Sequence, residues 1–266
     1  MRWLAWGKGV ALLVLAGLGD TVRAEREPTT PGFVAVGMAV TPQYEGADEH
    51  RAVPLLIAER RKGHRYVLLE GLSARANLVD APTLEAGPVI TYAFGRDQQI
   101  DDELVRRLAP IDDAVDVGVF VARAWRGIGR PGDALRIAVQ GLAEAAGTHD
   151  GWTVRPSASY AVSIGPRLFV RFDLSATYAS DGYMSTYFEV PVGGAVDPGL
   201  SGFDARAGIK DAGLGMLWSY ALGRQWSITG FAGGRRLLGD AADSPVVALA
   251  GTPNQFTLGL GIGRRF

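Results

Sequence analysis

The final stretch of the chain, Asn254 to Phe266, limits the possible fold most strongly. Its sequence, NQFTLGLGIGRRF, places a large apolar residue at every second position from Phe256 to Ile262, with threonine or glycine between them. Because successive side chains of a β-strand point to opposite faces, this period of two predicts a strand with one apolar and one small or polar face. An ordinary antiparallel edge strand would alternate in the same way, so the rest of the chain must decide between a soluble sheet and a barrel.

The same alternation recurs along the chain, most clearly over residues 152–163 and 168–178. In both segments the apolar face carries aromatic residues near its ends, as the lipid-facing side of a transmembrane β-strand does at the two membrane interfaces. A soluble β-sandwich also alternates, but its apolar face needs neither this length nor aromatic residues at both ends. Pro88 counts against a central strand over 84–94 unless it marks a bulge.

Loop lengths favour the barrel. Counted back from the C-terminus, the long loops fall at one end of the strands and the short turns at the other, which is the asymmetry of outer-membrane barrels. The long loops are 96–113, 143–151, 180–203 and 239–253, and the short turns are 80–82, 127–132, 164–167 and 222–224.

About eleven strands are visible in the sequence, whereas single-chain bacterial barrels have an even number. The segment from His64 to Val79 is either one long strand or two short strands split near Gly71. We therefore predict an all-β fold, a transmembrane antiparallel up-and-down β-barrel of about twelve strands, with ten as the alternative.

The N-terminus reads as a targeting segment. Arg2 and Lys8 precede an apolar run from Val10 to Leu18, which is too short to span a bilayer, and Ala24 ends a small-residue cleavage site. We expect a cleaved signal peptide over residues 1–24 and a single barrel domain over residues 25–266.

Composition excludes several classes of function. The chain has no cysteine, which rules out disulfides, thiolate catalysis and thiolate metal sites. Its 27 basic and 28 acidic residues give a formal net charge of -1, so no nucleic-acid partner is expected. The 36 glycines, together with 8 Tyr, 6 Trp and 10 Phe, suit many short strands and turns.

Polar residues on the opposite face of the predicted strands should point into the barrel. They form either a structural network that fills a narrow lumen or the lining of a small pore. The candidate lumen-lining residues are Glu85, Asp116, Arg136, Gln140, Arg155, Arg171 and Asp173.

No catalytic or metal site is predicted. The acidic loop residues Asp97, Asp101, Asp102, Glu103, Asp112 and Asp113 match no calcium-loop spacing, and a solvated loop facing lipopolysaccharide through bridging cations suits them better. The only histidines are His50, His64 and His149, and none forms the pairing with serine or aspartate that a barrel hydrolase or protease requires. We expect neither an enzyme nor a cofactor.

Seven stretches of the chain resemble the MipA/OmpV family of outer-membrane proteins. They span almost the whole predicted mature chain, and the last two are the most specific. The stretches are 44–48 (YEGAD), 77–80 (NLVD), 86–97 (AGPVITYAFGRD), 111–115 (IDDAV), 183–188 (YMSTYF), 208–211 (GIKD) and 237–245 (LLGDAADSP).

The resemblance implies an outer-membrane barrel, and it marks Lys210, Asp211, Asp240, Asp243 and Ser244 as a family motif at the barrel rim. In such barrels a C-terminal aromatic residue, here Phe266, is part of the signal read by the barrel-assembly machinery. Arg264 departs from the pattern, because such barrels usually carry an aromatic or apolar residue there.

The resemblance also implies a function. The name-giving member is described as a scaffold that joins a lytic transglycosylase to a murein synthase, while relatives are discussed as adhesins or porin-like proteins. We therefore expect a non-enzymatic scaffold in the bacterial outer membrane, in contact with lipid and lipopolysaccharide. The alternative is a small porin-like channel or transporter for small polar solutes.

Overall fold

The protein is described here by a computed structural model that covers residues 32–96, 100–191 and 200–266. The predicted signal peptide (1–24) and the acidic residue Asp97 lie outside these ranges. The strands are β1 (Gly32–Pro42), β2 (His50–Lys62), β3 (Arg65–Glu70), β4 (Ser73–Asn77), β5 (Leu84–Ala93), β6 (Ala114–Arg126), β7 (Ala134–Glu144), β8 (Trp152–Ile164), β9 (Leu168–Ala179), β10 (Gly208–Ala221), β11 (Trp226–Leu237) and β12 (Asn254–Arg265).

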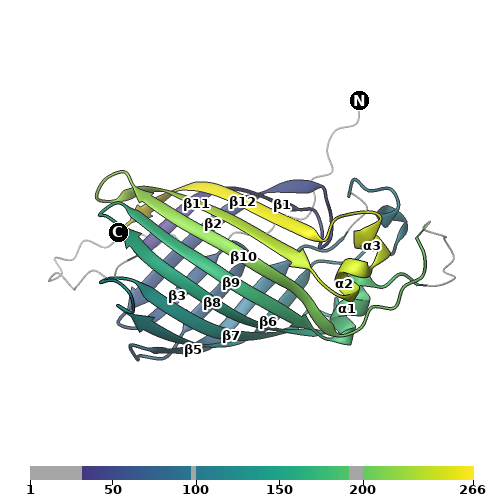
Figure 1. Cartoon of the computed structure of the whole chain (residues 1–266), viewed down its shortest axis with the longest axis horizontal. Helices are drawn as coiled ribbons and strands as arrows, with labels where there is room; N and C mark the ends of the chain where they lie inside the picture. The colour runs from purple at the N-terminus through teal and green to yellow at the C-terminus, as the bar shows by residue number, and fades with distance from the viewer. Residues whose placement is uncertain (1–31, 97–99, 192–199) are drawn as a thin grey trace, which may run out of the picture.

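Each strand pairs with its neighbours in sequence, and β12 returns to pair with β1, so the sheet is a closed antiparallel barrel (Figure 1). The seam runs from Phe33 opposite Arg265 to Val40 opposite Leu258. Phe266 closes its end, because its N–H donates to the Gly32 carbonyl (3.1 Å) and its carbonyl accepts from the Gly32 N–H (3.0 Å). Closure leaves no long unpaired edge at the seam, as a sheet in lipid requires.

The predicted fold class and the preferred strand number are confirmed. The uncertain segment 64–79 is two short strands, β3 and β4, joined by Gly71 and Leu72. Gly71 has a φ of 61°, which suits the first position of a two-residue hairpin turn and which residues with a Cβ adopt rarely.

Proline inside two strands coincides with local breaks in pairing. The regular ladder between β4 and β5 ends at Arg75 opposite Val89, next to Pro88. The ladder between β8 and β9 is interrupted between Val154 and Ser157, around Pro156. In each place the missing proline N–H falls where a ladder bond is absent.

The outer surface of the barrel is an apolar band. Many large apolar side chains that point outward are more than 40% exposed, among them Met38 on β1, Val119 on β6 and Leu258 on β12. Aromatic residues mark the band's two ends, with Trp152 and Tyr178 stacked near one end (5.8 Å between ring centroids) and Trp226 and Tyr220 exposed near the other. This is the pattern expected of a sheet that faces lipid.

The long loops project from one end of the barrel and the short turns from the other (Figure 1). Three helices lie in the long loops: α1 (Asp181–Phe188), α2 (Asp240–Asp243) and α3 (Pro245–Ala248), with a 3-10 turn at Val105–Arg107. The segments 180–203 and 239–253, predicted as loops, therefore contain helices. Following the outer-membrane convention, we call the long-loop end external and the short-turn end periplasmic.

Across the described ranges, no helix is long and apolar enough to cross a bilayer.

Candidate functional site in the barrel lumen

Most charged side chains inside the barrel neutralise one another. Arg171 on β9 donates to Glu70 on β3 (2.6 Å) and to Asp173 (2.9 Å). Arg136 on β7 donates to Glu85 on β5 (2.9 Å), which also accepts from the Tyr66 hydroxyl (2.8 Å). The Arg171–Glu70 pair joins β9 to β3 on opposite sides of the barrel, whereas the Arg136–Glu85 pair joins β7 to β5 across one intervening strand.

A second network lies where the lumen meets the external loops. Lys210 contacts Glu45 of the β1–β2 loop at short range and lies 2.8 Å from Asp211, and both residues are almost fully buried. Arg235 on β11 lies 3.6 Å from the same two carboxylates, and the Tyr183 hydroxyl donates to Glu45 (2.7 Å).

The charge of Glu45 is fixed by its neighbours. Burial opposes its ionisation, but the nearby Lys210 and Arg235 outweigh that effect, so the pKa of Glu45 lies below its ordinary value. Burial and the Glu45 charge together hold the pKa of the Tyr183 hydroxyl well above its ordinary value, which keeps the hydroxyl protonated as a donor.

Two adjoining cavities occupy the lumen, with volumes of about 530 and 440 Å³. Of the seven residues predicted to face inward, Arg136, Arg171 and Asp173 line the larger cavity, Asp116 lines the smaller, and Arg155 and Gln140 line both. Glu85 lies beneath them in its pair with Arg136.

Arg155 differs from the other lumen arginines. Its Nε donates to the Thr177 hydroxyl (3.1 Å), but among the described residues it forms no ion pair with a carboxylate. Arg75 is only loosely paired, because its guanidinium lies 3.8 Å from Glu70 and its Nε is buried without a hydrogen-bond partner.

A cluster of apolar side chains lies in the periplasmic half of the lumen. Ala35, Ile57, Tyr66, Leu68 and Leu217 are buried together, and Phe33, Leu55, Phe169 and Phe231 pack against them. Room for this cluster comes from the small face of β12, since a Cβ at Gly263 would lie 2.7 Å from the Phe33 ring. The glycines of β12, which the sequence predicts to form the small face of the strand, therefore leave space for this cluster. We call the cluster the apolar floor, because it lies beneath the cavities.

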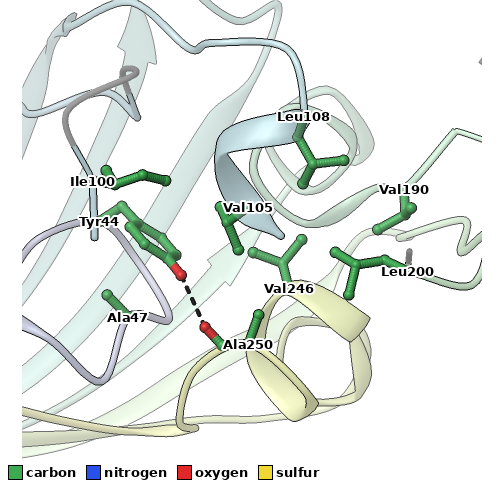
Figure 2. Packing of buried hydrophobic residues seen from close by; sticks show 9 residues of the cluster. All are labelled: Tyr44, Ala47, Ile100, Val105, Leu108, Val190, Leu200, Val246 and Ala250. Atoms are coloured by element: carbon green, nitrogen blue, oxygen red, sulfur yellow. Dashed lines mark hydrogen bonds between the residues drawn. The ribbon is translucent and has the colours of Figure 1, made fainter. Parts of the chain in front are cut away.

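The external loops form a cap with an apolar core of its own. Residues from the β1–β2 loop, the 3-10 turn, the segment after α1 and helix α3 meet in one cluster (Figure 2). The Tyr44 hydroxyl donates to the Ala250 carbonyl (3.0 Å), which joins two loops that are distant in sequence. The cluster contains Tyr44, Ala47, Ile100, Val105, Leu108, Val190, Leu200, Val246 and Ala250.

The family motif separates into two parts. Lys210 and Asp211 belong to the buried network. Asp240 accepts from the Arg206 N–H (2.9 Å), and Ser244 caps α3 at Val246 and donates to the Phe188 carbonyl (2.6 Å). Asp243 lies in α2 beside them. Asp240 and Ser244 thus hold loops of the cap together, whereas Asp243 is exposed.

The acidic loop residues make separate local contacts rather than forming one cluster. Asp102 accepts from the Val105 N–H (2.8 Å), Asp113 accepts from the Tyr92 hydroxyl and the Gly95 N–H, and Glu103 pairs with Arg106 (3.6 Å). Asp101 accepts from Gln43 (2.5 Å), and Asp112 is exposed. No group of three or more potential metal ligands was found in the described ranges.

His149 is placed to hold a loop. Its Nε2 lies 3.2 Å from Asp116, its Nδ1 accepts from the Gly151 N–H (3.2 Å), and the rings of Tyr183 and Tyr187 pack against it edge-on. These contacts fasten the β7–β8 loop to α1 and to the barrel wall.

The sequence reasoning did not single out Glu45, Glu70, Arg75 or Tyr183 as site residues. Glu45 and Tyr183 lie in two stretches that carry the family resemblance (44–48 and 183–188), which was an available signal. Glu70 and Arg75 lie on the two strands that the sequence left unresolved, so their facing could not be predicted.

Residues 34–266 of the chain match a known protein family, and the description of that family is MltA-interacting protein MipA. This protein belongs to the MipA family. No curated protein sequence matches the chain.

Several solved barrels are similar in fold. An outer membrane channel from Pseudomonas putida is 15% identical, with 94% of this chain and 100% of that chain covered and a TM-score of 0.45. The outer membrane channel DcaP of Acinetobacter baumannii is 9% identical, with 92% and 100% covered and a TM-score of 0.41.

Proposed function

We propose that this MipA-family barrel is a non-enzymatic scaffold of the bacterial outer membrane, and that its periplasmic end binds an anionic partner among the murein-processing enzymes. The expected partners are a lytic transglycosylase and, through it, a murein synthase. The family description supports the first partner, because it names an MltA-interacting protein. Lipid and lipopolysaccharide would contact the apolar band and the external cap.

The observation that carries the proposal is the charge of the periplasmic end. Within the described ranges, eleven basic side chains lie there and nearly all are exposed, whereas the acids there are Glu59, Asp80 and Asp133. We call this surface the basic rim; it consists of Arg60, Arg61, Lys62, Arg65, Arg123, Arg126, Arg130, Arg167, Arg224, Arg264 and Arg265. The near-zero net charge of the chain hides this separation of charge along the barrel axis.

The acids of the rim are occupied by local contacts. Asp133 accepts from the N–H groups of Ile128, Gly129 and Arg130 (2.9, 3.0 and 2.9 Å) and from the Tyr160 hydroxyl (2.7 Å). Asp80 accepts from the His64 N–H (3.1 Å), and Glu59 pairs with Arg61 (2.7 Å). These bonds fix the turns and leave the arginines at their tips to face a partner.

The test is binding of a lytic transglycosylase of the MltA type to the protein in lipid nanodiscs. The triple variant Arg130→Glu/Arg167→Glu/Arg224→Glu should weaken binding by roughly tenfold or more, and should flatten the salt dependence of Kd. The matched control is Arg107→Glu/Arg206→Glu/Arg236→Glu, which changes three exposed arginines at the external end of the barrel by the same charge. Equal loss of binding in both variants, or binding by neither wild type nor control, contradicts the proposal.

The two lumen cavities favour a second candidate, a small channel for polar solutes. The apolar floor below the cavities argues against an open path along the axis, because ions do not cross packed apolar side chains. Single-channel recording in a planar bilayer separates the two functions. The scaffold predicts a silent barrel, whereas discrete conductance steps that change in Arg171→Ala would establish the channel.

A further inference from the structure

The wall of the barrel is incomplete on one side. Strand β2 has 13 residues, but β3 and β4 have 6 and 5, and β3 pairs only with Ile57 to Lys62 of β2. Beyond the Gly71–Leu72 turn, the remaining part of β2, His50 to Leu55, faces no strand of the described chain on that side. Three strand spacings of about 4.8 Å separate β2 from β5 at the turn, so the gap above it is roughly 14 Å wide.

The frame of this gap, which we call the side window, is defined by contacts. Its lower edge is the turn, held by bonds from the Gly71 N–H to the Leu56 carbonyl (2.9 Å) and from the Tyr92 N–H to the Leu72 carbonyl (2.9 Å). Its upper edge is the Arg51 guanidinium, which lies 4.4 Å from the centre of the Phe94 ring. Side chains, rather than strands, therefore close the top of the window.

The sequence of β2 suits an open edge. The backbone N–H and C=O groups of successive residues point to opposite sides of a strand. The carbonyl of Leu56 points toward the turn, so the backbone groups of Pro54 and Ala52 point in the same direction, into the window. Pro54 has no N–H to leave unpaired, and proline in sheets is found at such edges. The carbonyl of Pro54 still needs a polar partner, which lipid chains do not supply.

The side window opens at the external end of the apolar band. On one side Ala52 and Pro54 stand opposite Val40 and Met38 of β1, which are large, outward-facing and exposed. On the other side the turn is bonded to Tyr92, so only Ala93 and Phe94 lie above it, whereas the exposed Ile90 pairs with Ala74 of β4 below the window. A molecule at the window would therefore meet the external leaflet of the membrane rather than bulk water.

Inside the window lie the two lumen cavities. Leu72, Arg75 and Arg155 line both cavities, so the window frame and the carboxylate-free arginine border the same space. The larger cavity has an apolar side with Val53, Leu55 and Phe231. Five arginines line it, and of these Arg155 alone forms no ion pair with a carboxylate of the described residues. The cap covers the external end of this space and the apolar floor covers the periplasmic end.

We propose that the larger cavity binds a small amphipathic organic anion, which enters from the external leaflet through the side window. The apolar part of the ligand lies against Val53 and Leu55, and its anionic group binds Arg155, with Arg75 as the second cation. This site is independent of the basic rim and of any murein partner.

Decanoate is the probe, measured as saturable binding to the wild-type protein in nanodiscs after subtraction of empty nanodiscs. Arg155→Gln should weaken binding at least tenfold, which corresponds to about 1.4 kcal/mol. Arg75→Gln should weaken it in the same direction and serves as the second variant. Arg123→Gln, which changes an exposed arginine on the outside of β6, should leave Kd unchanged. Heat-dependent gel migration identifies the folded variants.

The entry route through the side window is tested by measuring the rates of decanoate association and release. Leu72→Trp puts a larger side chain at the lower edge of the window and should slow both association and release of decanoate. Decyltrimethylammonium, a cation with the same chain, should not compete. The proposal is overturned by an absence of saturable binding, by equal competition from the cation, by unchanged affinity in both arginine variants, or by unchanged rates in Leu72→Trp.

Discussion

Neutralising Glu45 should destabilise the folded barrel more than neutralising any exposed glutamate. The Glu45 side chain is 12% exposed and faces Lys210, Arg235 and the Tyr183 hydroxyl. In Glu45→Gln the side-chain volume is kept and Tyr183 still has an acceptor, but two cations are left with the single carboxylate of Asp211.

The magnitude follows from this geometry. Removing one partner of a buried ion pair costs about 3–5 kcal/mol, because the remaining charge stays buried. Lys210 keeps its contact with Asp211 (2.8 Å), so we expect a loss near the lower limit, about 3 kcal/mol. With an m-value of about 5 kcal/mol/M in guanidinium chloride, the unfolding midpoint should fall by roughly 0.6 M.

The assay is equilibrium unfolding in lipid vesicles, followed by tryptophan fluorescence. The control is Glu103→Gln, because Glu103 is 78% exposed and its pair with Arg106 lies on the surface of a loop. Exposed pairs contribute about 0.2–1 kcal/mol, so this midpoint should barely move. If the two variants unfold at the same midpoint, the buried network does not stabilise the cap and the reasoning is wrong.

Two further predictions concern pH and packing. The pKa of Glu45 is lowered in the folded state, so its contribution to the free energy of unfolding is complete above its ordinary pKa of 4.5 and is lost as pH falls below that value. The wild type and Glu45→Gln should therefore have different unfolding midpoints at pH 7 and similar midpoints in acid. Gly263→Val should lower the free energy of unfolding by about 1–3 kcal/mol in the same assay, because its Cβ would collide with Phe33 and Ser227. Gly141→Val is the control, because no atom lies within 4 Å of the new Cβ, and its effect should be far smaller. Equal effects of the two variants would contradict the packing of the floor.

The fold was predictable because β-barrels in lipid obey few and local rules. The period of two in β8, β9 and β12 fixed which residues face lipid, and the even strand number demanded a twelfth strand that was not visible. The long cap loops were harder, because helices α2 and α3 have four residues each and depend on contacts such as Ser244 with Phe188 rather than on helical periodicity.

The sequence predicts which side chains face the lumen, but it does not predict which charged side chains form ion pairs there. Alternation placed Arg136, Arg155 and Arg171 inside the barrel, yet which carboxylate each meets depends on strand register across the lumen. Arg171 pairs with Glu70, a residue 101 positions away, and Arg155 pairs with none in the described chain. No local pattern distinguishes these two arginines.

The short hairpin of β3 and β4 explains why twelve strands are present rather than ten. Without it β2 and β5 could pair directly along their length, and barrel diameter grows with strand number, so a ten-stranded lumen would be narrower. The hairpin widens only the periplasmic part of the wall, where Tyr66 and Leu68 extend the apolar floor. It also supplies Glu70, which holds Arg171, and Arg75, which is left loosely paired at the cavity. The same element that builds the floor therefore leaves the wall open above it, which is why the lumen, covered at both ends, still has a side window.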